Sequence, residues 1–103
     1  MHLPIKLKAM KIALAQINQT IGDFQRNTEK ICSYIERARN QNVELIVFPE
    51  LAVTGYPPKD FLDIPAFIDE NLKALNEITS RVSGISAIVG FVDRNKRRHG
   101  KLV

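Results

Sequence analysis

Short apolar segments alternate along the chain with longer segments whose apolar residues recur at helical spacing. The short segments are MKIALAQI (10–17), VELIVF (43–48) and SAIVGFV (86–92). They are too short for typical helices and favour strands that are buried on both faces. Helices are expected from about Phe24 to Gln41, and from near Pro65 to a stop at Gly84. The order strand–helix–strand–helix–strand predicts an α/β fold with a mainly parallel sheet and right-handed crossovers.

Each expected helix has an apolar stripe that should face the sheet. The stripe of the first helix is Ile31, Ile35 and Ala38, with Cys32 beside it, and Glu29, Glu36, Arg37 and Arg39 lie outside. The stripe expected for the second helix is Ile68, Leu72, Leu75 and Val82. Before the first helix, Gly22 and Asp23 break the strand, and we interpret Asp23 and Asn27 as caps rather than substrate ligands.

Composition is that of a soluble, globular, single-domain protein. The chain has 103 residues, of which 45% are hydrophobic and 25% charged. No uninterrupted apolar run exceeds four residues, and MHLPIKLKAM lacks the apolar core of a signal peptide, so we expect neither a membrane span nor a secretion signal. The single cysteine cannot form an internal disulfide, which fits a reducing compartment. The protein is therefore expected in the cytoplasm.

The net charge of +4 comes from the two ends of the chain. Residues 94–101, RNKRRHGK, carry five basic residues and no acidic one, whereas residues 12–93 carry seven basic and eleven acidic residues. A nucleic-acid interface usually concentrates its charge on a structured face. A solvated turn is therefore favoured over a phosphate-binding patch, and no nucleic-acid partner is expected. His2 and His99 have no paired ligands at metal spacing, so no metal site is predicted.

One acidic residue follows the second expected strand directly. Glu50 comes after Pro49, which has no N–H to continue the strand ladder. In the loop behind it, Gly55 permits a backbone conformation that other residues avoid, and Pro57 and Pro58 each fix φ. Ligands of open parallel sheets bind beyond the carboxyl ends of the strands. A rigidly placed carboxylate there suits a general base, because proton transfer depends first on geometry. The alternative is a loop-anchoring acid or an exposed charge. TIGDF (20–24) follows the first strand, in place of a glycine-rich nucleotide-binding fingerprint.

The same segments resemble a known family. LIVFPELAVTGYPPKDF (45–61) resembles the glutamate motif of the nitrilase, or carbon–nitrogen hydrolase, superfamily, and MKIALAQINQTIGDFQRNTEKI (10–31) resembles its first strand and helix. More narrowly, both are similar to the N-terminal glutaminase domain of bacterial glutamine-dependent NAD synthetases. The resemblance covers residues 10–103 and leaves residues 1–9 as an extension. It implies part of an α-β-β-α sandwich of nitrilase type, truncated after the first strands and the two outer helices.

The resemblance also implies chemistry. The family uses a Glu, a Lys and a Cys, and only the Glu is carried over, onto Glu50, as general base; the other two are expected beyond residue 103. The whole enzyme would hydrolyse glutamine and pass ammonia to a downstream synthetase domain of the same chain. That domain would use ATP and magnesium to convert nicotinic acid adenine dinucleotide to NAD. A homo-oligomer is expected, and the 103-residue chain alone is expected to be inactive.

Other readings stay open. The protein could be a stand-alone carbon–nitrogen hydrolase acting on another amide or a nitrile, or a non-catalytic assembly module. Cys32, on the apolar stripe, is expected to pack as a hydrophobe and not to act as nucleophile. Lys59 is interpreted as a solvated loop charge. Tyr56 either packs the loop or closes over the site, and Thr54 has no assigned role.

Overall fold

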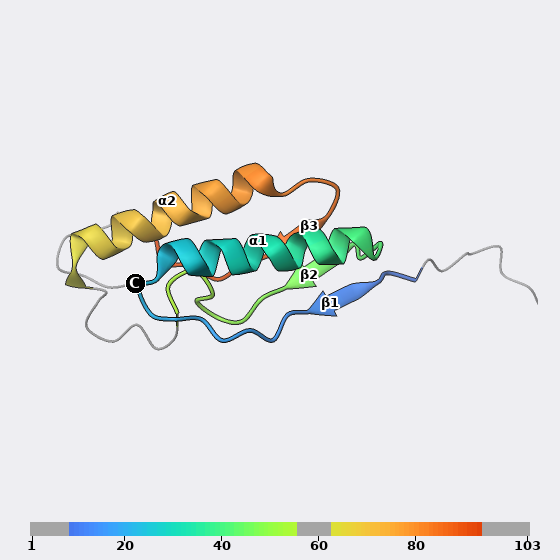
Figure 1. Cartoon of the computed structure of the whole chain (residues 1–103), viewed down its shortest axis with the longest axis horizontal. Coiled ribbons are helices and arrows are strands. Elements are labelled where there is room, and N and C mark those ends of the chain that lie inside the picture. Colours follow the sequence, from blue (N-terminus) through green and yellow to red (C-terminus); the bar gives the residue numbers. More distant parts are fainter. Residues whose placement is uncertain (1–8, 56–62, 94–103) are drawn as a thin grey trace, which may run out of the picture.

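The computed structural model describes residues 9–55 and 63–93. Along these residues the elements are β1 (Ile12–Leu14), α1 (Phe24–Asn40), β2 (Leu45–Val47), α2 (Pro65–Arg81) and β3 (Ser86–Ile88) (Figure 1). The predicted alternation of strands and helices is therefore confirmed, although each strand is only three residues long.

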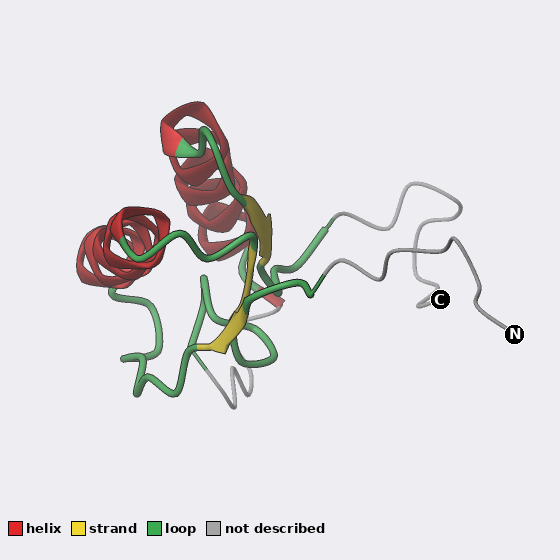
Figure 2. Cartoon of the chain, turned by 90° about the vertical axis from the view of Figure 1, so that its right-hand side faces the viewer, coloured by secondary structure: helices red, strands yellow, loops and turns green. Residues whose placement is uncertain are grey.

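The three strands form one parallel sheet in the order β1-β2-β3. Leu45 pairs with Ile12 on one side and Ser86 on the other, and Val47 pairs with Leu14 and Ile88. Because the strand order follows the chain, two crossovers of the same hand place their helices on the same face of the sheet. Figure 2 shows both helices on one side of the strands.

Helix α1 begins and ends as its sequence predicts. Asp23 is the N-cap, and its Oδ1 accepts a hydrogen bond from the Arg26 N–H at 3.2 Å. The expected stripe is buried: Ile31, Cys32, Ile35 and Ala38. The interpretation of Asn27 as a cap was wrong. Asn27 lies one turn inside the helix, and its side chain binds loop backbone instead of the helix end.

Helix α2 begins at Pro65, as predicted, but its buried stripe differs from the expected one. The buried residues are Phe67, Asn71, Ala74 and Ile78, whereas Ile68, Leu72, Leu75 and Val82 are only half-buried. The helix is rolled so that the Phe67 ring meets the Phe24 ring edge-on, with 5.0 Å between centroids. The small Ala74 lies where α1 and α2 meet. The expected stop at Gly84 was not correct, because the helix ends at Arg81 with an extended C-cap at Val82, and Gly84, with φ of +73°, lies two residues beyond the cap.

The core lies between the sheet and the helices. Ile46 of β2 faces the helices and is 2% exposed. Side chains that alternate with it along the strands point to the other face, where Ile12 is 52%, Leu14 73% and Ile88 55% exposed. The expectation that the strands are buried on both faces was therefore wrong for the described part of the chain, because both of its helices cover the same face.

Several sequence predictions fall outside the described residues. They concern the extension up to residue 8, the segment Tyr56–Pro57–Pro58–Lys59, the basic turn after Asp93, and His2 and His99. Within the described ranges, neither helix combines the length and the apolar character needed to cross a membrane.

Candidate active site

Glu50 lies beyond the carboxyl end of β2, at the edge of the sheet where a ligand is expected to bind. After the strand, the Phe48 N–H donates to the Ile88 carbonyl at 3.0 Å, and Pro49 has no N–H to continue the ladder. The Glu50 side chain is exposed and borders a hollow of about 210 Å³. The residues that line this hollow with it are Ile17, Asn18, Gln19, Pro49, Leu51 and Ala52. The site therefore lies between the loops that follow β1 and β2.

The backbone directly after Glu50 turns sharply. Leu51 has φ of +53°, a region that residues with a β-carbon rarely adopt, and such strain is often retained at functional sites. The Gly55 N–H donates to the Leu51 carbonyl at 2.9 Å and closes the turn. Gly55 itself has φ of +88°, and a β-carbon there would lie 2.7 Å from the Ile21 Cα. The predicted conformational need for glycine at this position is confirmed.

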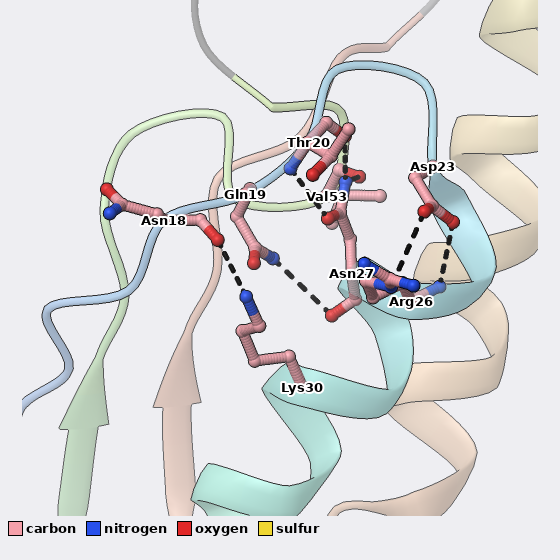
Figure 3. Close-up of polar contacts among 8 residues, drawn as sticks. All are labelled: Asn18, Gln19, Thr20, Asp23, Arg26, Asn27, Lys30 and Val53. Atoms are coloured by element: carbon pink, nitrogen blue, oxygen red, sulfur yellow. Dashed lines mark hydrogen bonds and ion pairs between the residues drawn. The ribbon is translucent and has the colours of Figure 1, made fainter.

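The loop is held by the connection between β1 and α1. The Ala52 carbonyl accepts from Gln19 Nε2 at 2.7 Å, the Val53 carbonyl from Asn27 Nδ2 at 3.0 Å, and the Thr54 carbonyl from the Gly22 N–H at 2.9 Å. Figure 3 shows the Asn27 side chain directed at Thr20 and Val53, and the Gln19 side chain directed at the Asn27 carbonyl. The loop that follows the candidate base is thus held by residues 19–27, which lie about 30 positions earlier in the sequence.

Gly90, just after β3, supports the loop from the other side. Its carbonyl accepts from the Val53 N–H at 3.2 Å. A β-carbon at Gly90 would lie 2.5 Å from the Leu51 nitrogen and 3.3 Å from the Glu50 carbonyl carbon. No real β-carbon tolerates the shorter of these distances, so any other residue at this position must displace the peptide that follows Glu50.

Sequence reasoning found Glu50 and Gly55 but missed Gln19, Asn27 and Gly90. A signal for Asn27 was present, because it precedes Ile31 by four residues and so lies on the buried stripe of α1. A polar side chain in that position is expected to be hydrogen-bonded. No comparable signal exists for Gly90, whose contact depends on the packing of two loops. Thr54, to which no role was given, is fully buried, and its hydroxyl lies 3.1 Å from the Gly55 carbonyl oxygen.

Cys32 is not part of this site. It is 5% exposed within the core, and burial, the largest effect, raises the pKa of its thiol from the ordinary 9.0, while Arg81 opposes the rise. A neutral, buried thiol is a poor nucleophile, so the prediction that Cys32 packs as a hydrophobe is confirmed. The described residues contain no group of three or more His, Cys, Asp or Glu side chains that could hold a metal ion.

Most of the chain is similar to known proteins. Residues 11–102 match the carbon–nitrogen hydrolase family. The chain belongs to this family. It is 36% identical over 92 residues to the glutamine-dependent NAD(+) synthetase of Thermotoga maritima, and 37% identical over 92 residues to that of Xanthomonas campestris. These matches cover 87% and 88% of the chain but only 16% and 17% of the relatives.

Two solved synthetase structures are also similar to most of this chain. The glutamine-dependent NAD(+) synthetase of Cytophaga hutchinsonii superimposes with a TM-score of 0.80 at 31% identity, covering 84% of this chain and 15% of that one. The synthetase of Acinetobacter baumannii in complex with ADP gives 0.80 at 38% identity, covering 86% and 17%. An amidase from Nesterenkonia sp. gives 0.65 at 28% identity, covering 78% and 30%. The nitrilase-type α/β fold predicted from the sequence is confirmed.

Proposed function

We propose that this chain is part of the glutaminase domain of a glutamine-dependent NAD synthetase, with Glu50 as its general base. The observation that carries this assignment is an exposed carboxylate at the carboxyl edge of the sheet, beside a hollow of about 210 Å³ and followed by a loop whose backbone is held by hydrogen bonds. Relatives that match most of the chain at 36% and 37% identity are synthetases of this kind and support the substrate, glutamine.

In the proposed reaction, Glu50 takes the proton of a cysteine thiol that residues outside this chain supply. The thiolate attacks the glutamine amide carbon, and a lysine, also supplied from outside, stabilises the oxyanion. The carbon–nitrogen bond breaks, the proton passes to the leaving nitrogen, and ammonia departs from a thioester. Glu50 then removes a proton from water, which attacks the thioester, so that glutamate leaves and the thiol is regenerated. Both half-reactions need one base within reach of the same position.

Further parts of the proposal rest on the sequence resemblance. A downstream synthetase domain of the same chain would use ATP and magnesium to amidate nicotinic acid adenine dinucleotide with the released ammonia. The complete protein would be a cytoplasmic homo-oligomer. The 103-residue chain alone would release no ammonia from glutamine, because the lysine and the nucleophilic cysteine are supplied elsewhere.

The test is Glu50→Gln in the complete protein, with Glu36→Gln on the exposed side of α1 as the matched control. Glutamine keeps the shape of the side chain but cannot accept the thiol proton. We expect glutamine-dependent ammonia release to fall by about 100-fold or more, the range found for loss of a general base. The control should keep wild-type turnover, and both variants should melt at the wild-type temperature. Wild-type ammonia release by Glu50→Gln would mean that Glu50 is not the base, and would favour a non-catalytic assembly role for this part of the protein.

A second candidate is a stand-alone carbon–nitrogen hydrolase acting on another amide. The similarity to the Nesterenkonia amidase, with a TM-score of 0.65, favours it, because the same base would serve either substrate. Assaying the complete protein with glutamine and with simple aliphatic amides separates the two. Preference for glutamine, and NAD formation with ammonia or glutamine as nitrogen donor, support the synthetase. Turnover of simple amides alone supports the amidase.

A further inference from the structure

Asn27 is the most completely bonded polar side chain near the candidate base. It is 0% exposed, and Nδ2 donates to the Thr20 carbonyl at 2.9 Å and to the Val53 carbonyl at 3.0 Å. Its Oδ1 accepts from the Thr20 N–H at 3.2 Å. One amide on α1 therefore joins the connection after β1 to the loop after Glu50, as Figure 3 shows for Thr20 and Val53. Breaking one of these buried hydrogen bonds is costly, because it leaves a donor or an acceptor unsatisfied away from water.

Gln19 adds a second amide to the same arrangement. Its Nε2 lies 2.7 Å from the Ala52 carbonyl oxygen and 3.4 Å from that of Asn27. Two carbonyl acceptors require the NH₂ group here, so the orientation of the amide is fixed. The opposite atom, Oε1, is buried and has no hydrogen-bond partner among the described residues. An unpaired buried acceptor opposes folding, so the contribution of Gln19 lies in the bonds that its Nε2 donates to the Ala52 and Asn27 carbonyls.

The connection that carries Gln19 is itself fixed to α1. Lys30 Nζ donates to the Asn18 carbonyl at 2.7 Å, and Asn27 holds Thr20 from both sides. The strained Leu51, with φ of +53°, lies between Glu50 and the carbonyls of residues 52 and 53 that the two amides hold. A strained residue keeps its conformation only when its surroundings impose it. Releasing these carbonyls would let Leu51 relax and carry Glu50 away from its position.

We propose that Asn27, assisted by Gln19, is a positioning residue that sets the place of Glu50 through the carbonyls of Val53 and Ala52. This role rests on the proposed function of Glu50 as general base. Asn27 does not line the hollow beside Glu50, whereas Gln19 does. The role assigned to both side chains is positioning of the loop and not contact with the substrate. Both act on the rate of proton transfer, which depends steeply on the distance between base and reacting group.

The test is Asn27→Asp in the complete protein, compared with Asn71→Asp. Asn71 on α2 is equally buried, and its amide accepts from the Val92 N–H at 3.1 Å and donates to the Val92 carbonyl. It therefore makes the same kind of bond, but to Val92, two residues beyond the Gly90 contact, and not to the loop that follows Glu50. At a temperature where both variants are folded, we expect kcat for glutamine hydrolysis to fall by about 10- to 100-fold in Asn27→Asp, with KM within about threefold of wild type. Asn71→Asp should keep kcat within about threefold.

The deciding measurement repeats Asn27→Asp in the Glu50→Gln background. A residue that acts only through Glu50 loses its effect when the base is absent, so residual kcat should change by less than about twofold. An equal loss in both backgrounds, or an equal loss in Asn71→Asp, would overturn the inference. If Glu50→Gln alone keeps wild-type turnover, the proposed function of Glu50 fails instead.

Gln19→Leu keeps the inference testable if Asn27→Asp does not fold. This change removes the bond to Ala52 and also the unpartnered Oε1, so the melting temperature should fall little. We expect kcat to fall by about 3- to 10-fold, again only in the presence of Glu50. Wild-type kcat in folded Gln19→Leu would count against the role of Gln19 and, where Asn27→Asp is insoluble, against the whole positioning pair.

Discussion

Gly84 and Gly90 lie on either side of β3, and the two positions need glycine for different physical reasons. Gly84, before the strand, has φ of +73°, and a β-carbon there would meet only the Arg39 side chain, at 3.4 Å. Its requirement is conformational. Gly90, after the strand, instead faces the backbone of Glu50 and Leu51 at distances too short for a β-carbon. Only the second requirement concerns the site, because Gly84 lies at the opposite edge of the sheet.

Gly90→Ala is therefore expected to impair catalysis, and Gly84→Ala only stability. The added methyl group at residue 90 must push the Leu51 nitrogen away from 2.5 Å, which moves the peptide that carries Glu50. Overpacking of this kind costs about 1–3 kcal/mol, and a displacement of about 1 Å lowers kcat by about 100-fold. Melting temperature and kcat for glutamine, measured on the complete protein, separate the two effects. Comparable kcat values in both variants would show that the Gly90 contact does not position the base.

At the scale of elements, the two helices differ in how far their sequences predict their packing. Asp23, Gly55 and Pro65 were predicted correctly because their roles depend on local backbone chemistry: a cap, a positive φ and a first helical position. The buried stripe of α1 was also predicted, since its apolar residues have a single helical face. Helix α2 offers two overlapping apolar faces, and its contact with α1 and the segment after β3 decides between them.

In this contact Asn71 and Ala74 are buried, whereas the larger Leu72 and Leu75 are only half-buried. Ala74 has little side chain to separate the helices, and Asn71 has an amide that satisfies the backbone of Val92. Neither is recognisable as a core residue from hydrophobicity alone. Hydrophobicity alone also does not identify Asn27, or Gly90, whose neighbours Glu50 and Leu51 lie in the loop after β2. What the sequence could not predict is therefore the part of the site that depends on contacts between elements.

The observed orientation of α2 predicts which substitution costs more. Ile78 is 2% exposed, whereas Leu75, on the stripe expected from the sequence, is half-buried. Ile78→Ala should lower the free energy of unfolding by about 2–5 kcal/mol, because a fully buried side chain leaves a cavity. Leu75→Ala should cost about 1 kcal/mol, since less area leaves water. Thermal melting of the two variants gives the order. A larger loss for Leu75→Ala would mean that the helix is rolled toward the other stripe.

At the scale of the whole molecule, the sheet has one covered and one uncovered face. Both helices lie on the same side, as Figures 1 and 2 show, and Ile12, Leu14 and Ile88 are more than half exposed on the other. Leu14, Val47 and Ile88 lie in one register row across the three strands. A contiguous apolar face on a small protein usually marks a surface that another layer covers. The α-β-β-α sandwich implied by the sequence resemblance would supply that layer as a second sheet, so this part of the architecture stays a prediction.

Leu14→Lys should reduce self-association of the 103-residue chain but lower the thermal stability of the complete protein. In the 103-residue chain, a charge on the uncovered face should reduce self-association, seen as a smaller apparent mass in light scattering, because less apolar surface is available to a second copy. In the complete protein the same lysine would be buried against the second sheet, and the melting temperature should fall by several degrees because a buried charge without a partner is strongly unfavourable. Ser33→Lys, on the exposed side of α1, is the control and should change neither quantity. If Leu14→Lys leaves the complete protein as stable as the control, no further part of the chain packs on this face, and the sandwich architecture is wrong for this protein.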